Sequence, residues 1–160
     1  MQEIPAKKSY EFKLYQTSIV YGGKIYFLPF NASNVAIYDL NTRIFEIVEI
    51  PQLQRECQNG RFMNGFVTGD TLVMIPFGAR RILHFDMKCC QVTGECSLDG
   101  IIKEEDLFYC YTKTDDDKLL LPSLTSNTVV FYDIKSKYAT ITNIGKEDFC
   151  YAGIALSDNN

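Results

Sequence analysis

The sequence has no tryptophan, a single histidine and no apolar run long enough to cross a membrane. A membrane-spanning helix needs about 18 or more apolar residues, so no membrane partner is expected. Aspartate and glutamate (20) outnumber lysine and arginine (16), which gives a formal net charge of −4. A nucleic-acid-binding domain ordinarily has a basic surface, so nucleic acid is not expected as a partner either.

One histidine also leaves little material for catalysis or metal binding. His84, Cys89, Cys90 and Cys96 form a cluster, but their spacing matches no standard zinc site. No glycine-rich phosphate loop lies between a strand and a helix. We therefore expect no catalytic residues, no bound metal and no cofactor.

Two further absences bear on location. The first residues, MQEIPAKKSYEFK, lack the apolar segment of a secretory signal. The six cysteines are then expected to be reduced thiols and not a disulfide framework. Cys110 and Cys150 are expected in strands, as small apolar residues. These observations favour a cytoplasmic location.

What the sequence does contain is one pattern written three times, in residues 22–50, 69–98 and 116–144. Each copy has an apolar run that stops at a proline and a second run that ends in an aromatic residue followed by aspartate. The prolines (Pro29, Pro76, Pro122) are 47 and 46 residues apart, and the aspartates (Asp39, Asp86, Asp133) are 47 and 47 apart. A fixed period of this size indicates a repeat architecture.

Each copy divides into four short β runs. We expect strands at 15–21, 24–28, 34–38 and 44–50, then at 62–68, 72–75, 81–85 and 91–98, then at 107–113, 118–121, 128–132 and 138–144. Residues 148–156 match the first run of a fourth copy. The pattern predicts an all-β fold, a β-propeller of three four-stranded blades plus the first strand of a fourth. The alternative, a β-sandwich of about twelve strands, does not explain the constant period.

The whole chain, 1–160, is then a single partial propeller domain. Its expected blades are about 14–50, 61–98 and 107–144, and the fourth would start at about 148–156.

The order of these elements resembles a kelch repeat. Its aromatic pair with seven-residue spacing is matched by Tyr38 and Phe45, and more loosely by Phe85 with Val92 and by Tyr132 with Ala139. Where kelch repeats have a diglycine, this chain has Pro-Phe twice and Pro-Ser once. That form is also similar to propellers of gut clostridia. The resemblance implies a propeller that binds proteins or peptides, although a minority of such propellers are enzymes.

Acidic residues are expected to be structural. Asp39, Asp86 and Asp133 fit turns between the third and fourth strands, where an aspartate bonds its own backbone two residues on. The run Asp115-Asp116-Asp117 falls at a hairpin turn and lacks the spaced oxygen ligands of a calcium loop.

The loops after each second strand and the connectors between blades share one face around the channel of a propeller. We expect a weak ligand-binding set on that face: Phe30, Asn31, Asn34, Phe77, Arg80, Arg81, Ser126 and Asn127. At least one of the two arginines is expected to line the channel face and bind carboxylates. The alternative for Phe30 and Phe77 is packing on the neighbouring blade.

The favoured function is a non-catalytic binding module for a protein, peptide or sugar. The alternatives are a propeller enzyme acting on carbohydrate in its central channel, and an incomplete gene fragment without independent function. Residues 156–160 fall at the first turn of the fourth copy, so the blades would form an open arc with two apolar faces in water. This fits either the start of a longer propeller or a homodimer that completes a ring. In both cases we expect the isolated monomer not to be a stable species.

Overall fold

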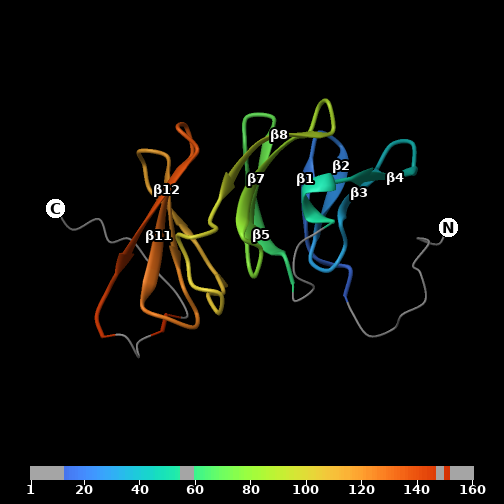
Figure 1. Ribbon diagram of the computed structural model, residues 1–160. Helices are drawn as coiled ribbons and strands as arrows, with labels where there is room; N and C mark the ends of the chain where they lie inside the picture. Colours follow the sequence, from blue (N-terminus) through green and yellow to red (C-terminus); the bar gives the residue numbers. More distant parts are fainter. Residues whose placement is uncertain (1–12, 55–59, 147–149, 152–160) are drawn as a thin grey trace.

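The computed structural model describes residues 13–54, 60–146 and 150–151, and in this part the chain forms three four-stranded antiparallel sheets. The strands of each sheet pair in chain order, and the three sheets stand side by side (Figure 1). The first sheet contains β1 (Tyr15–Tyr21), β2 (Lys24–Pro29), β3 (Asn34–Asp39) and β4 (Phe45–Glu49). The second contains β5 (Phe62–Thr68), β6 (Thr71–Pro76), β7 (Arg81–Asp86) and β8 (Gln91–Ser97). The third contains β9 (Thr112–Lys113), β10 (Lys118–Pro122), β11 (Thr128–Asp133) and β12 (Tyr138–Asn143).

The repeat seen in the sequence is also a repeat of strand register. Asp39 lies opposite Lys24, Asp86 opposite Thr71, and Asp133 opposite Lys118. The seven-residue spacing joins direct cross-strand neighbours, namely Tyr38 with Phe45, Phe85 with Val92, and Tyr132 with Ala139. Cross-strand pairs of this kind are the unit by which antiparallel sheets are stabilised.

The prolines end the second strands at positions that agree to within one residue, as expected. In the ladder Lys118 corresponds to Thr71, so Pro122 stands where the second sheet has Ile75 and not Pro76. β10 is consequently five residues long, whereas β2 and β6 have six.

The first strand of the third sheet is much shorter than expected, covering 112–113 instead of 107–113. The backbone before it is bonded elsewhere. The N–H of Phe108 donates to the carbonyl of Phe77 (2.9 Å), and the carbonyl of Leu107 accepts from the N–H of Leu124 (2.7 Å). Cys110 therefore lies outside β9, contrary to the expectation that it sits in a strand. The connector after the first sheet contains a 3₁₀ turn, η1 (Pro51–Leu53).

Of the expected fourth-blade strand, 148–156, only residues 150 and 151 fall within the described part of the chain. The N–H of Tyr151 donates to the carbonyl of Ser123 (3.0 Å). Arg61 and Phe108 likewise donate to Phe30 and Phe77, the residues that follow β2 and β6. Tyr151 thus bonds to the third sheet as the start of each later sheet bonds to the one before. Cys150 is exposed and lies outside any strand, whereas the sequence predicts a small apolar strand residue there.

The apolar core lies between the sheets, in two clusters. We call the face of a sheet that points towards the next sheet its rear face, and the opposite one its front face. Rear-face residues Tyr26, Val35, Ile37 and Ile50 of the first sheet meet front-face residues of the second, namely Leu72, Met74, Leu83 and Phe85. The rear face of the second sheet meets the front face of the third in the same way, through Val73, Ile75, Ile82, Leu119, Leu121, Val130 and Tyr132. Sheets that bury their faces only against neighbours are the organisation expected of propeller blades. No helix in the described ranges is long and apolar enough to span a membrane.

Candidate ligand-binding site

A hollow of about 450 Å³ lies among β1, β5 and the segment that leads into β9. β1 and β5 contact each other along the edges of their sheets. The strand pairing places Met63 at the position of Gln16 and Asn64 at that of Thr17, while Tyr109 and Cys110 lie in the segment that leads into β9. All six line the hollow together with Tyr111. Each of the three repeats therefore contributes two neighbouring side chains to the hollow.

Two β-bulges orient residues that line the hollow. The pairing of β1 with β2 shifts between Tyr15 and Thr17, and that of β5 with β6 shifts between Phe62 and Asn64. Gln16 and Met63 are the extra residues at these shifts. A bulge bends its strand and redirects a side chain, and bulges are frequent beside binding sites.

Hydrogen bonds between neighbouring sheets hold the hollow open. The hydroxyl of Thr17 donates to the carbonyl of Met63, and the amide of Asn64 donates to the carbonyl of Tyr109 (2.7 Å). The two bonds join equivalent positions of successive sheets. The Tyr111 hydroxyl donates to the carbonyl of Gly65 (3.4 Å), and burial raises the pKa of this tyrosine above its usual value. The floor of the hollow is thus fixed before any ligand binds.

The exposed groups of the hollow suit binding. The side chain of Tyr109 is 51% exposed and offers a flat apolar ring, while the amide of Gln16 is also exposed. Aromatic rings and amides together recognise ligands that have an apolar face and hydrogen-bonding groups. The described residues that line the hollow include no carboxylate and no imidazole.

The phenylalanines expected at the loop face pack against each other. The rings of Phe30 and Phe77 are 5.9 Å apart, and Gly60 lies against both. A Cβ at Gly60 would be 2.5 Å from the Phe30 ring, and the residue has a φ of +76°, so glycine is required there. The geometry at these two rings is the neighbouring-blade packing that the sequence left open.

The asparagines hold the same region together. Asn31 donates to the carbonyl of Lys13 (2.9 Å) and accepts from the N–H of Gly60 (3.2 Å). Asn34 accepts from the hydroxyl of Tyr15 and donates to Glu49 (3.3 Å). Both side chains are partly buried.

The two arginines lie in different contacts. Arg80 donates to the carbonyls of Ile102 (2.9 Å) and Lys103 (2.6 Å) and pairs with Asp99 (3.3 Å), so it ties the connector between the second and third sheets. Arg81 pairs with Glu95 (3.2 Å) on the neighbouring strand. Neither is among the described residues that line the hollow, and their binding of carboxylates stays a prediction.

Ser126 and Asn127 are buried, each 3% exposed. Ser126 and Ser123 donate to the carboxylate of Asp106, which is itself buried and also accepts from the N–H of Lys103 (2.8 Å). The amide of Asn127 donates to the carbonyl of Gly145 (3.4 Å). This buried cluster joins the connector at Asp106 to the loop after β10.

The regular aspartates cap turns. One carboxylate oxygen of Asp39 accepts two backbone N–H groups, at 2.8 and 2.9 Å, and Asp86 and Asp133 repeat the arrangement. These bonds lower the pKa of all three carboxyls, with the largest contributions from the N–H groups of Thr42, Cys89 and Ser136.

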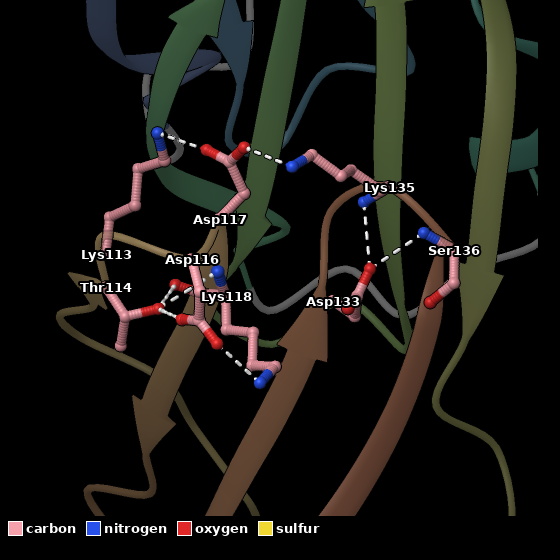
Figure 2. Close-up of polar contacts among 8 residues, drawn as sticks. All are labelled: Lys113, Thr114, Asp116, Asp117, Lys118, Asp133, Lys135 and Ser136. Carbon is pink, nitrogen blue, oxygen red and sulfur yellow. Dashed lines mark hydrogen bonds and ion pairs between the residues drawn. The ribbon is translucent and has the colours of Figure 1, made fainter.

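The acidic turn before β10 is neutralised by lysines, as Figure 2 shows. Asp117 pairs with Lys113 (2.7 Å) and Lys135 (3.1 Å), and Asp116 pairs with Lys118. The second sheet repeats one of these contacts, since Lys88 and Asp70 occupy the positions of Lys135 and Asp117. Three cations therefore face these two carboxylates, which makes the turn an ion-pair network. Within the described residues, no group of three or more His, Cys, Asp or Glu side chains could hold a metal ion.

The comparisons with known proteins extend to the fold alone. No family model matches the chain, and no curated protein matches its sequence. Among solved structures, a streptogramin B lyase is similar with a TM-score of 0.60 and 14% identity, over 84% of this chain and 43% of that one. The extracellular domain of the hybrid two-component system BT4673 from B. thetaiotaomicron has a TM-score of 0.62 and 14% identity, over 83% of this chain and 17% of that one. The WD40 repeats of RRP9 have a TM-score of 0.53 and 11% identity, over 79% of this chain and 36% of that one.

These neighbours are propeller-like proteins built of four-stranded antiparallel sheets, so the chain has an all-β, β-propeller fold with three blades in its described part. The chain spans less than half the length of each of these structures. They include a lyase and a repeat domain, so the fold accommodates both enzymes and binding proteins. The kelch resemblance stays a prediction.

Proposed function

We propose that this chain is a non-catalytic binding module of the kelch-like kind, which binds a peptide segment of a protein or a sugar in the hollow between the innermost strands. The supporting observation is that β1, β5 and the segment leading into β9 converge on one preformed cavity of about 450 Å³. Ligand sites are ordinarily concave, largely preformed and of this size, with a few polar groups that orient the ligand. The exposed ring of Tyr109 provides the stacking surface, and the amide of Gln16 provides hydrogen bonds.

The loop face expected from the sequence belongs to the same proposal. The hollow is formed where the innermost strands begin, directly after the connectors between sheets. Phe30, Phe77 and Arg80 hold the loops and connectors at this end in place through contacts within the protein. Their part in binding is to shape the rim of the hollow. The free thiols of the adjacent Cys89 and Cys90 support a reducing compartment, and we propose the cytoplasm.

Immobilised peptide and glycan arrays test this function. The wild-type chain is expected to bind a defined set of peptides or sugars, and Tyr109→Ala is expected to weaken that binding at least tenfold, since one stacked aromatic ring is a typical hot spot. Tyr138→Ala is the matched control, because Tyr138 is 66% exposed on the outermost strand of the same sheet. Binding that Tyr109→Ala leaves unchanged, or an absence of binding to both arrays, would refute the proposal.

A further inference from the structure

Two faces of the arc differ from every other face in the described part of the chain, because no sheet lies against them. These are the front face of the first sheet and the rear face of the third. The repeat allows a direct comparison at one position. Ile50 is 1% exposed and Leu98 0%, but the equivalent Ile144 on the third sheet is 47% exposed. Ile144 is therefore an exposed branched apolar side chain at a position that is buried in the other two sheets.

The front face of the first sheet is a continuous aromatic surface. The rings of Tyr15 and Phe27 are 6.1 Å apart, those of Phe27 and Phe45 6.2 Å, and those of Tyr38 and Phe45 4.6 Å. The positions of Phe27 and Tyr38 in the second sheet are occupied by Met74 and Phe85, which are fully buried against the first sheet. Val20, at the edge of the same surface, is 66% exposed. Large contiguous apolar surfaces of this kind mark interfaces.

The two internal joints, which are the contacts of the second sheet with the first and with the third, show what such a front face binds. In both, a front face receives the rear face of another sheet of this chain. The rear face of the third sheet presents Leu120, Phe131 and Ile144, at the positions where the first sheet uses Tyr26, Ile37 and Ile50 for this purpose, whereas Val129, at the position of Val35, is already buried in the single copy. The open rear face therefore has the chemistry that the open front face fits.

We propose that a second copy of this chain covers both faces. The front face of the first sheet of each copy receives the rear face of the third sheet of the other, twice, about a two-fold axis. Two copies then close a ring of six sheets, and the innermost strands of the partner complete the wall of the hollow. A heterologous contact that closes in this way yields a defined oligomer instead of an open chain. This inference does not depend on which ligand the hollow binds.

The oligomeric state of the full purified chain tests the ring. Sedimentation velocity is expected to give a dimer, with twice the 18.3 kDa mass of the chain. Val20→Glu on the front face and Ile144→Glu on the rear face are each expected to weaken dimerisation at least tenfold, because each buries an unpaired carboxylate twice per ring. Both side chains are exposed in the single copy, so the variants are expected to fold, which circular dichroism checks. Thr42→Glu is the control, because Thr42 is an exposed turn residue whose equivalents in the other two sheets, Cys89 and Ser136, stay exposed beside the internal contacts.

A mixture of the two glutamate variants adds a second readout. In the mixed dimer both substitutions fall in one contact and the other contact is intact, so mixing is expected to restore a part of the association. A wild-type monomer would overturn the proposal and indicate that residues 1–12 or 152–160 cover these faces. An open-ended series of larger species, or a dimer insensitive to both substitutions, would also overturn it.

Discussion

The joint between the second and third sheets contains a buried polar pair that can be removed with substitutes taken from the repeat itself. Nε2 of His84 on β7 lies 2.6 Å from the hydroxyl oxygen of Tyr132 on β11, and both side chains are buried. At the position of His84 the first sheet has Ile37, and at the position of Tyr132 the second sheet has Phe85. The variants His84→Ile and Tyr132→Phe, alone and together, therefore replace the pair by residues that the architecture already accepts.

The single change Tyr132→Phe is expected to lower the free energy of unfolding by about 1–3 kcal/mol, because it leaves a buried imidazole nitrogen without its partner. His84→Ile is expected to cost a similar amount, since the tyrosine hydroxyl is then unpaired. The double variant removes both polar groups, and its free energy of unfolding near pH 7.5 is expected to lie within about 1 kcal/mol of the wild type.

Acidification separates the imidazole from other causes. Burial, and then the charge of Lys137, lower the pKa of His84 from 6.5 to about 4. The unfolded chain therefore binds a proton that the folded chain does not, over the window from about pH 6.5 down to about pH 4, and stability falls as the pH drops through it. Between about pH 7.5 and about pH 5 this single group is expected to cost the wild type about 2 kcal/mol, a loss that the double variant lacks.

Urea unfolding followed by circular dichroism at the two pH values measures these differences. The quantity of interest is the decrease in the free energy of unfolding of the wild type on acidification minus the same decrease in the double variant. This difference removes the contribution of all carboxyl groups. Equal losses in the two proteins would show that His84 is not held neutral in the folded state. A Tyr132→Phe variant as stable as the double variant would show that the hydrogen bond contributes nothing.

Two further substitutions test the packing and the turns. Gly65→Ala places a Cβ 2.8 Å from the carbonyl oxygen of Val73 and 3.0 Å from Leu28, so urea unfolding is expected to show a loss of stability of about 1–3 kcal/mol. Ser18→Ala, at the equivalent exposed position of β1, should change stability by less than about 0.5 kcal/mol. Equal effects of the two substitutions would contradict the close contact at Gly65. Asp86→Ala removes the acceptor of two backbone N–H groups, whereas Asp86→Asn keeps an acceptor oxygen. The alanine variant is therefore expected to have the lower thermal midpoint of unfolding. A lower midpoint for the asparagine variant would contradict the capping role.

Much of the fold could be predicted because the repeat places the same residue type at the same point of each blade. The aspartate turns and the prolines are of this kind, and their spacing gave the strands of the first two sheets to within one or two residues. The first strand of the third sheet could not be predicted in the same way. Its residues 107–111 have the composition of a strand, but Leu107 and Phe108 bond to the loops after β10 and β6, and the carbonyl of Tyr109 accepts from the Asn64 side chain on β5.

The hollow was not predicted, because its positions share no residue type. Gln16, Met63 and Tyr109 line the hollow together, yet these residues share no common chemistry, and the bulges that orient Gln16 and Met63 have no sequence signal. The one available signal was the period itself, which carries residue 16 to residue 63 after 47 positions and to residue 109 after a further 46. The sequence predicts Ser126 as a ligand-binding loop residue, but it is buried against Asp106, which lies in a connector whose charged sequence predicts exposure to solvent.

Because each sheet pairs its strands in chain order, its hydrogen bonds join residues that are close in sequence, as in the β1–β2 hairpin where Tyr21 lies opposite Lys24. Pairings of this kind close small loops and form early, whereas the joints between sheets bring together residues almost a full repeat apart. During synthesis, each sheet can therefore form as soon as its last strand leaves the ribosome and then dock on its predecessor. The N-terminal sheet acts as the template, and folding proceeds along the chain in the direction of translation.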